Sequence, residues 1–199
     1  MQFAGPAIVC ASRPHGETAA VVRLLTENHG LIAGYVAGGR GRQLRPVLVP
    51  GNLVEADLRA RIEGQLPFAR LELLTSRGPW LGEPLPAAAI GWATALTAAA
   101  LPERHAYPAL FPALSALLDA VCHAPSARGW LPGLLAYEAL LLRELGYGET
   151  RLESGAELPA MLAAFDALGA RLDRYPLAER RNDVMGARAM LRERLARIG

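Results

Sequence analysis

The sequence predicts an α+β protein in which a five-stranded antiparallel barrel is followed by an all-helical domain. Before about residue 80, apolar residues form short runs separated by glycines, and one of these runs alternates strictly. After the proline-rich stretch 79–86, apolar residues adopt helical spacing. The chain has 199 residues, which suits two small domains, and we predict them at 1–80 and 81–199.

The five strands are predicted at 7–12, 18–26, 31–37, 52–62 and 68–75. The fourth is the clearest, because Val54, Ala56 and Leu58 alternate with charged residues. Several short strands with turn residues every 8–12 positions favour a small antiparallel barrel.

Five helices are predicted at 87–101, 110–123, 131–145, 158–172 and 183–198. Gly146 and Gly148 end the third helix, as glycines commonly do at a helix C-terminus. Leucines occupy more than one face of that helix, which predicts that it is the buried centre of the bundle.

The charge is mildly basic and unevenly distributed. The net charge is +2, and all 21 basic residues are arginine, a bias we attribute to genome base composition. Residues 1–80 hold nine arginines against six acidic residues, and residues 81–199 hold twelve against thirteen. The predicted barrel is therefore the basic part of the chain. No apolar run is long enough to cross a membrane, so we expect no membrane association and a cytoplasmic location.

The sequence offers no enzymatic site. The four histidines and the two cysteines, Cys10 and Cys122, do not repeat a metal-ligand spacing, and no Gly-x-Ser-x-Gly motif occurs. The glycine-rich stretch 38–42 lacks the Lys-Ser/Thr ending of a nucleotide-binding loop. We therefore predict no catalytic residue, no metal and no cofactor.

That glycine-rich stretch nevertheless places Arg40 and Arg42, with Arg45 close behind, on a loop after a strand. Guanidinium groups in such a loop suit the phosphates of a single nucleic-acid strand. The alternative, a solvated loop whose arginines serve solubility, is equally compatible with this segment. Tyr35, just before the loop, is a candidate for base stacking or an ordinary core residue.

Four segments in this order and spacing together resemble the RecO family: 7–18, 24–30, 36–42 and 145–148. The resemblance implies an N-terminal OB-fold and a C-terminal helical domain. It also implies binding of single- and double-stranded DNA, annealing of complementary strands, and work with RecR to load RecA on SSB-coated DNA. The nucleic-acid-binding residues we assign are Arg40, Arg42, Arg45, Tyr35 and Arg13.

Two departures from the family pattern bear on metal and partner binding. Many members carry a cysteine-bearing insertion, sometimes a zinc site, where residues 149–156 hold no cysteine, so we expect no zinc. The family binds the SSB C-terminal tail through the helical domain, and members commonly have a basic residue where this chain has Ala136. Arg128 and Arg143 are the candidate substitutes for holding the tail's carboxylate.

Two other functions compete with a DNA-binding mediator that is nucleoid-associated. One is a protein-interaction scaffold that docks RecR and SSB with little DNA binding of its own, since the basic surplus of the barrel is only three charges. The other, an enzyme with an unrecognised site, ranks last because no titratable groups cluster in the sequence.

Overall fold

The computed structural model describes residues 2–60, 62, 64–150, 155, 157–178 and 181–198, except for the side chains of 181–183. The chain forms two compact units. One comprises Met1–Gly82 with Leu101–Phe111, and the other comprises Glu83–Ala100 with Pro112–Gly199. The segment Leu101–Phe111 therefore groups with the strands, although it follows one helix in the sequence and includes the first two residues of the next.

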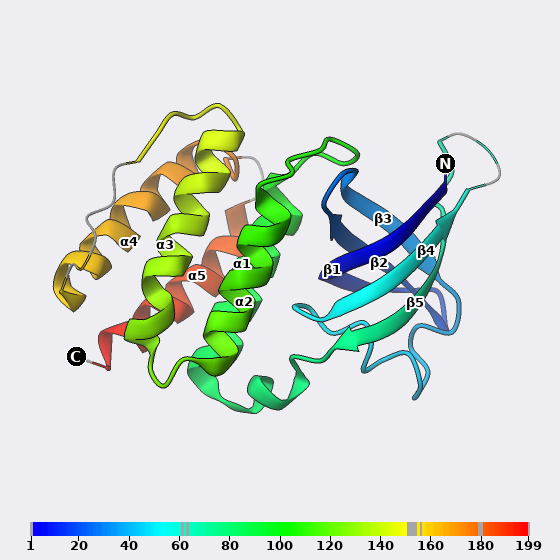
Figure 1. The fold of residues 1–199 in the computed structure, drawn as a ribbon, viewed down its shortest axis with the longest axis horizontal. Coiled ribbons are helices and arrows are strands. Elements are labelled where there is room, and N and C mark those ends of the chain that lie inside the picture. The colour runs from blue at the N-terminus through cyan, green and yellow to red at the C-terminus, as the bar shows by residue number, and fades with distance from the viewer. Residues whose placement is uncertain are drawn as a thin grey trace. The chain divides into compact units, whose positions relative to one another are not determined.

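Five strands make up the first unit: β1 (Gln2–His15), β2 (Ala19–Thr26), β3 (Gly30–Val36), β4 (Leu53–Arg59) and β5 (Phe68–Thr75) (Figure 1). They are ordered β1-β2-β3-β5-β4, and β4 pairs with β1 to close the ring. This is the arrangement of an OB-fold, a five-stranded and partly open barrel. The predicted α+β class is confirmed.

The sheet is mixed, so the prediction of an entirely antiparallel barrel is wrong at one seam. The other neighbouring strands pair antiparallel, but β3 and β5 run parallel and meet at one registered pair, Tyr35 and Phe68. A closed ring with an odd number of strands cannot alternate direction throughout, so at least one pair must be parallel. Here the parallel seam is also the shortest.

The barrel core follows the alternation seen in the sequence. Val54, Ala56 and Leu58 on β4 are fully buried, whereas Glu55 and Arg59 between and beside them are exposed. The strand ends at Arg59, and residue 61 of the longer strand predicted at 52–62 lies outside the described residues. Inward side chains from all five strands form one apolar cluster that includes Leu48 of the β3–β4 connection.

The segment Leu101–Phe111 attaches to the edge of β3. Leu31 and Glu103 form a parallel bridge, and the backbone N–H of Arg104 donates to the carbonyl of Leu31 at 2.9 Å. Gly30 has a φ of +67°, and a Cβ there would overlap the backbone carbonyl of His105. Only glycine suits that position, since it accepts the left-handed conformation and leaves room for the backbone.

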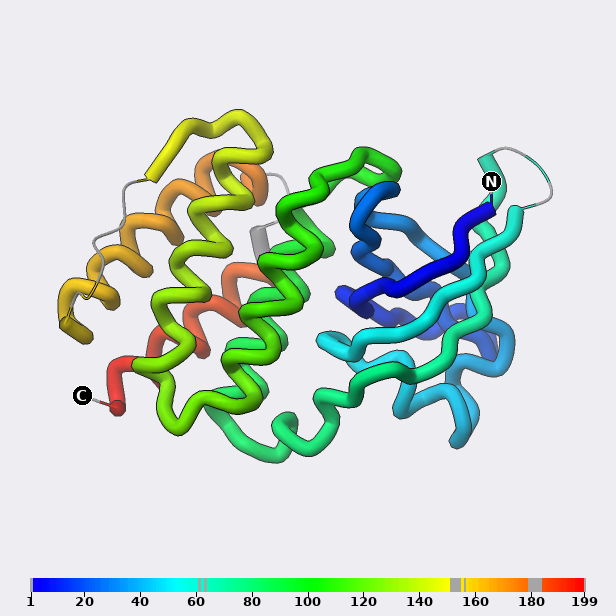
Figure 2. Tube along the Cα trace, in the orientation of Figure 1, coloured from blue at the N-terminus to red at the C-terminus, as the bar shows by residue number. Residues whose placement is uncertain are grey.

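The described part of the second unit is built from the helices α1 (Pro84–Ala100), α2 (Leu110–His123), α3 (Ala127–Glu144), α4 (Leu158–Arg174) and α5 (Arg181–Ala196) (Figure 2). A short 3-10 turn, η1 (Gly78–Gly82), precedes α1 and belongs to the first unit. All five predicted helices are present. The third begins four residues earlier than predicted, at Ala127, so Pro132 lies inside the helix and not in its first turn. Its leucines are buried, except for Leu140, which is partly exposed.

No helix in the described ranges is both long enough and apolar enough to cross a membrane.

Candidate nucleic-acid interface

The three candidate arginines of the glycine-rich loop lie between β3 and β4 and are all exposed. Arg40 differs from the other two because its guanidinium Nη1 donates to the carbonyls of Gly16 and Glu17, at 3.1 and 2.9 Å. Its backbone N–H also donates to Thr18 at 3.0 Å. Arg40 therefore fastens the loop to the β1–β2 turn, a role that its position in the sequence did not reveal.

Arg42 and Arg45 are the loop arginines available to a ligand. Within the described part of the chain, neither guanidinium has a hydrogen-bond or ion-pair partner. The loop beneath them is well anchored, because Leu48 is buried in the barrel core and Asn52 donates to the carbonyls of Pro46 and Val47. Two cations on an anchored loop suit phosphate oxygens, which guanidinium groups bind in a bidentate manner.

One line of strand register links the other candidates. Arg13 on β1 pairs with Val21 on β2, Val21 with Tyr35 on β3, Tyr35 with Phe68 on β5, and Phe68 with Arg59 on β4. Directly paired residues share a face of the sheet. Since the sequence neighbours Val22, Val36, Leu58 and Ala69 point into the core, this line of residues lies on the outer face.

Tyr35 and Phe68 lie on that line, and the ring of His15, two residues beyond Arg13 on β1, lies against Tyr35; these three side chains are here named the aromatic row. The His15 and Tyr35 rings are 5.8 Å apart at 88°, and the Tyr35 and Phe68 rings are 5.2 Å apart at 74°. Tyr35 is half-buried on the outer face, and Phe68 is 65% exposed. Tyr35 is therefore not a core residue. The sequence analysis did not include Phe68 among the nucleic-acid-binding residues. Its position at the start of a predicted strand, directly after a loop, is the sequence feature that could have indicated it.

The two arginines at the ends of this register line differ in whether an acidic side chain pairs with them. Arg59 donates to the Asp57 carboxylate from Nε at 2.9 Å and from Nη2 at 2.8 Å. This pairing lowers the pKa of Asp57 and raises that of Arg59. Arg13 is exposed and has no such partner among the residues that the structure describes. Arg13 is thus the more available cation of the two.

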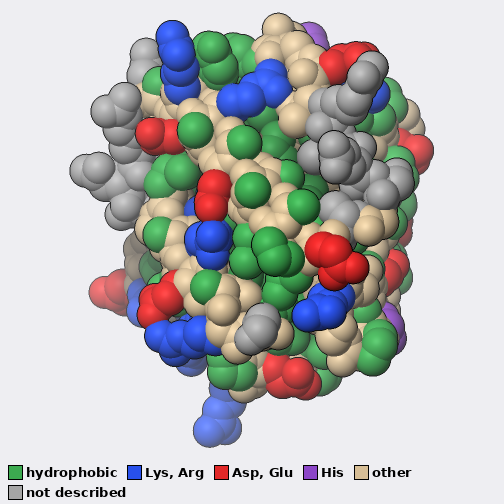
Figure 3. Space-filling model, turned by 90° about the vertical axis from the view of Figure 1, so that its left-hand side faces the viewer, with side chains coloured by type: hydrophobic (Ala, Val, Ile, Leu, Met, Phe, Trp, Pro, Cys, Tyr) green, Lys and Arg blue, Asp and Glu red, His purple; other side chains and the backbone are tan. Residues whose placement is uncertain are grey.

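The structure does not bring together the two arginines proposed for partner binding. Arg128 lies in the first turn of α3 and Arg143 in its last, about 22 Å apart along the axis at 1.5 Å per residue. Arg143 also pairs with Glu144 at 3.1 Å. On the face of the helical unit shown in Figure 3, acidic and basic side chains are interspersed.

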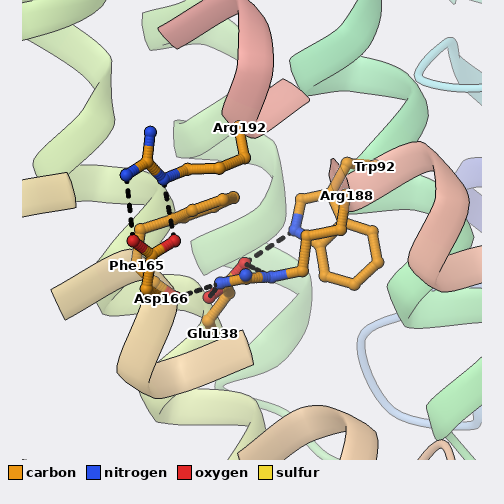
Figure 4. A network of polar contacts seen from close by, with 6 residues as sticks. All are labelled: Trp92, Glu138, Phe165, Asp166, Arg188 and Arg192. Carbon is orange, nitrogen blue, oxygen red and sulfur yellow. Dashed lines mark hydrogen bonds and ion pairs between the residues drawn. The ribbon is translucent and has the colours of Figure 1, made fainter. Parts of the chain in front are cut away.

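Glu138, two residues after Ala136 on α3, belongs to a buried polar network (Figure 4). The Glu138 carboxylate accepts from Trp92 of α1 at 2.7 Å and from Arg188 of α5 at 2.8 and 3.3 Å. Burial raises the pKa of Glu138, and the Arg188 guanidinium and the Trp92 N–H oppose that shift. Sequence reasoning missed this network because Arg188 is fifty residues from Glu138.

Among the described residues, no group of three or more histidine, cysteine or acidic side chains could hold a metal ion. The segment 149–156, where a zinc insertion is expected to be missing, lies mostly outside the described residues.

The fold and the exposed arginine and aromatic side chains define an OB-fold protein with an appended helical unit. Two family models match this chain: Recombination protein O N terminal over residues 1–77, and Recombination protein O C terminal over residues 84–150. Together they match most of the chain, and the chain belongs to the RecO family.

Curated relatives agree with the family models. The chain is 47% identical over 150 residues to a DNA repair protein RecO from Rhodospirillum centenum, a match that covers 74% of this chain and 58% of the relative. It is 43% identical over 150 residues to a DNA repair protein RecO from Phenylobacterium zucineum, covering 74% of this chain and 60% of the relative. The chain therefore matches less than two thirds of the length of these relatives.

Proposed function

We propose that this chain is a non-enzymatic mediator of DNA repair and homologous recombination. It binds single- and double-stranded DNA, anneals complementary strands and, with RecR, helps to load RecA on SSB-coated DNA. The single observation that carries the proposal is the OB-fold barrel of a RecO family member that presents Arg42 and Arg45 on an anchored loop. Its relatives bear the name DNA repair protein RecO.

Binding is electrostatic in this proposal. Arg42, Arg45 and Arg13 contact phosphates and so bind with little sequence preference. Neutralising the charge of each strand lowers the repulsion between two complementary strands, which favours their pairing. Such a protein works where DNA is found, in the cytoplasm and associated with the nucleoid.

The helical unit is the proposed partner-binding part. Because Arg128 and Arg143 lie at opposite ends of α3, the carboxylate of an SSB tail would contact one of them and not both. Arg128 is the better candidate, since Arg143 is partly neutralised by Glu144.

An annealing assay tests the proposal directly. Two complementary labelled strands, bare or coated with SSB, are mixed with the chain, and the rate of duplex formation is followed by energy transfer. We expect faster annealing with the wild-type chain and a loss of that acceleration with the double variant Arg42→Glu and Arg45→Glu. Unchanged annealing rates, combined with binding of an SSB-tail peptide, would favour the scaffold function over the mediator.

A further inference from the structure

We propose that Phe68 stacks on an unpaired base and thereby makes the barrel prefer single-stranded over double-stranded DNA. This inference rests on the DNA binding proposed above. It assigns to Phe68 the discrimination between single-stranded and double-stranded DNA, which the arginines alone do not provide. Phosphates are present in both forms of DNA, whereas the face of a base is accessible only when the base is unstacked.

Exposure is the first observation. Phe68 is 65% exposed, the highest value among the large apolar side chains that the structure describes. A phenylalanine on the outer face of a strand gains little from the barrel core, but it offers apolar area to a flat ligand. The edge-on contact with Tyr35 at 5.2 Å holds the Phe68 ring from one side, which reduces the ordering cost of stacking.

The surroundings of Phe68 supply the second observation. It directly follows the β4–β5 loop, where Ile62 is 61% and Leu66 is 39% exposed. His15, at the other end of the aromatic row, precedes the β1–β2 turn. In OB-folds, the outer face of strands 2 and 3 and these two loops are the surfaces that bind oligonucleotides. The aromatic row therefore lies where a single strand crosses this type of barrel.

Charge complementarity selects a nucleic acid as the occupant of this face. Arg59 is registered directly beside Phe68, Arg70 lies two residues along β5, and Arg13 lies on the same register line. Asp57, the acidic side chain nearest to them, is bound by Arg59 and registered opposite Arg70, whereas Glu55 and Glu72 are registered opposite each other farther from Phe68. An apolar ring among arginines fits a base with flanking phosphates better than it fits an apolar protein surface.

The test compares single and double strands on matched variants of the full chain. Affinities are measured by fluorescence anisotropy for an oligothymidylate of about 20 nucleotides, longer than the roughly 4–16 that one OB-fold occupies. The other ligands are a duplex of the same length and a strand of the same length that carries abasic sites. The variants are Phe68→Ala and Phe68→Trp, with Leu74→Ala and Leu74→Trp as controls, since Leu74 is also on β5, 52% exposed and outside the aromatic row.

We expect Phe68→Ala to weaken single-strand binding roughly 5- to 100-fold, as one lost stacking contact predicts. Duplex binding should change by less than about 2-fold, because phosphate contacts remain. The abasic strand should bind the wild-type chain weakly and respond little to the substitution. Phe68→Trp should retain affinity, and the single strand should quench its added fluorescence, whereas the Leu74 variants should bind normally and show no such quenching.

Two results overturn the inference. Equal losses for single strand and duplex on Phe68→Ala would mean that Phe68 supports the barrel rather than reads unpaired bases. Unchanged single-strand affinity would remove Phe68 from the interface altogether. If the wild-type chain bound neither form of DNA, the proposed function would itself be contradicted, and with it this inference.

Discussion

Arg188 on α5 and Glu138 on α3 form an ion pair in the interior of the helical unit, with Nη2 2.8 Å from Oε2. The carboxylate is fully buried and the arginine nearly so. The guanidinium also lies 3.6 Å from the Phe165 ring centroid and donates to the Phe165 carbonyl at 2.5 Å. A Cβ on Gly169 would overlap this guanidinium, so the guanidinium occupies this position only because residue 169 has no side chain. The pair thereby connects α3, α4 and α5.

Breaking this pair should destabilise the helical unit strongly. Arg188→Met leaves the Glu138 carboxyl buried without its cation, and we expect a loss of about 3–5 kcal/mol in the free energy of unfolding. The double variant Glu138→Leu with Arg188→Met should lose less than the sum of the single losses, because no unpaired charge remains. Urea denaturation of the four proteins measures this cycle, and additive losses would contradict the pairing.

The Arg188→Met variant should also have a distinctive pH dependence. Burial already raises the pKa of Glu138, and removal of Arg188 takes away the strongest opposing influence. A carboxyl whose pKa is higher in the folded than in the unfolded state loses stability as pH rises through the interval between the two. The variant should therefore be closest to wild type below the ordinary pKa of glutamate and diverge as pH rises. A constant difference from pH 4 to pH 8 would contradict this origin.

The glycine at the β2–β3 turn gives a test of how Leu101–Phe111 attaches to the barrel. Gly30→Ala combines a positive φ with overlap of the His105 carbonyl, whereas Gly16→Ala has a similar φ of +60° and open space. We expect Gly16→Ala to cost about 1 kcal/mol and Gly30→Ala clearly more. Thermal unfolding of both variants makes the comparison, and equal losses would show that His105 moves away without cost.

Arg40 and Arg42 on the same loop should have different roles, because Arg40 holds the loop in place and Arg42 is available to bind DNA. Arg40→Gln removes the donors to Gly16 and Glu17, so the amides of the loop should exchange hydrogen faster. Arg42→Gln removes an exposed side chain without a described partner, so it should weaken DNA binding and leave exchange unchanged. Hydrogen exchange and fluorescence anisotropy on both variants check this. Faster exchange in the Arg42→Gln variant together with weaker DNA binding by the Arg40→Gln variant alone would contradict these roles.

The local pattern of apolar and polar residues predicted the strands and helices of this fold well. It could not predict contacts between residues that are far apart in the sequence. The alternation around Val54 and Leu58 is a property of neighbouring residues, and β4 lies within the range it predicted. The parallel pairing of Tyr35 with Phe68 depends on how the ring closes, which no local pattern contains. For the same reason, the sequence placed Arg40 in the candidate site but could not show that the β1–β2 turn binds its guanidinium.

The sequence also could not predict which residues contact the buried polar groups. The sequence did not show that the Glu138 carboxylate is bound by Arg188 and Trp92. The sequence analysis names Arg128 and Arg143 as candidates for binding the same carboxylate. Because α3 contains both residues, helix geometry places them too far apart to bind it together. The composition did indicate which unit is basic, and the exposed Arg42 and Arg45 lie on that unit.

The most direct test of DNA binding by the barrel is the salt dependence of affinity for a fluorescent single strand. The wild-type chain is compared with Arg42→Gln/Arg45→Gln on the barrel and with Arg128→Gln/Arg143→Gln, which removes the same charge from the helical unit. We predict salt-sensitive binding by wild type, with a slope of log affinity against log salt that is shallower by about 0.7 for each lost phosphate contact in the barrel variant. The helical variant should keep the wild-type slope. No binding at low salt, or equal slopes in all three proteins, would contradict the proposal that this barrel binds DNA through its loop arginines.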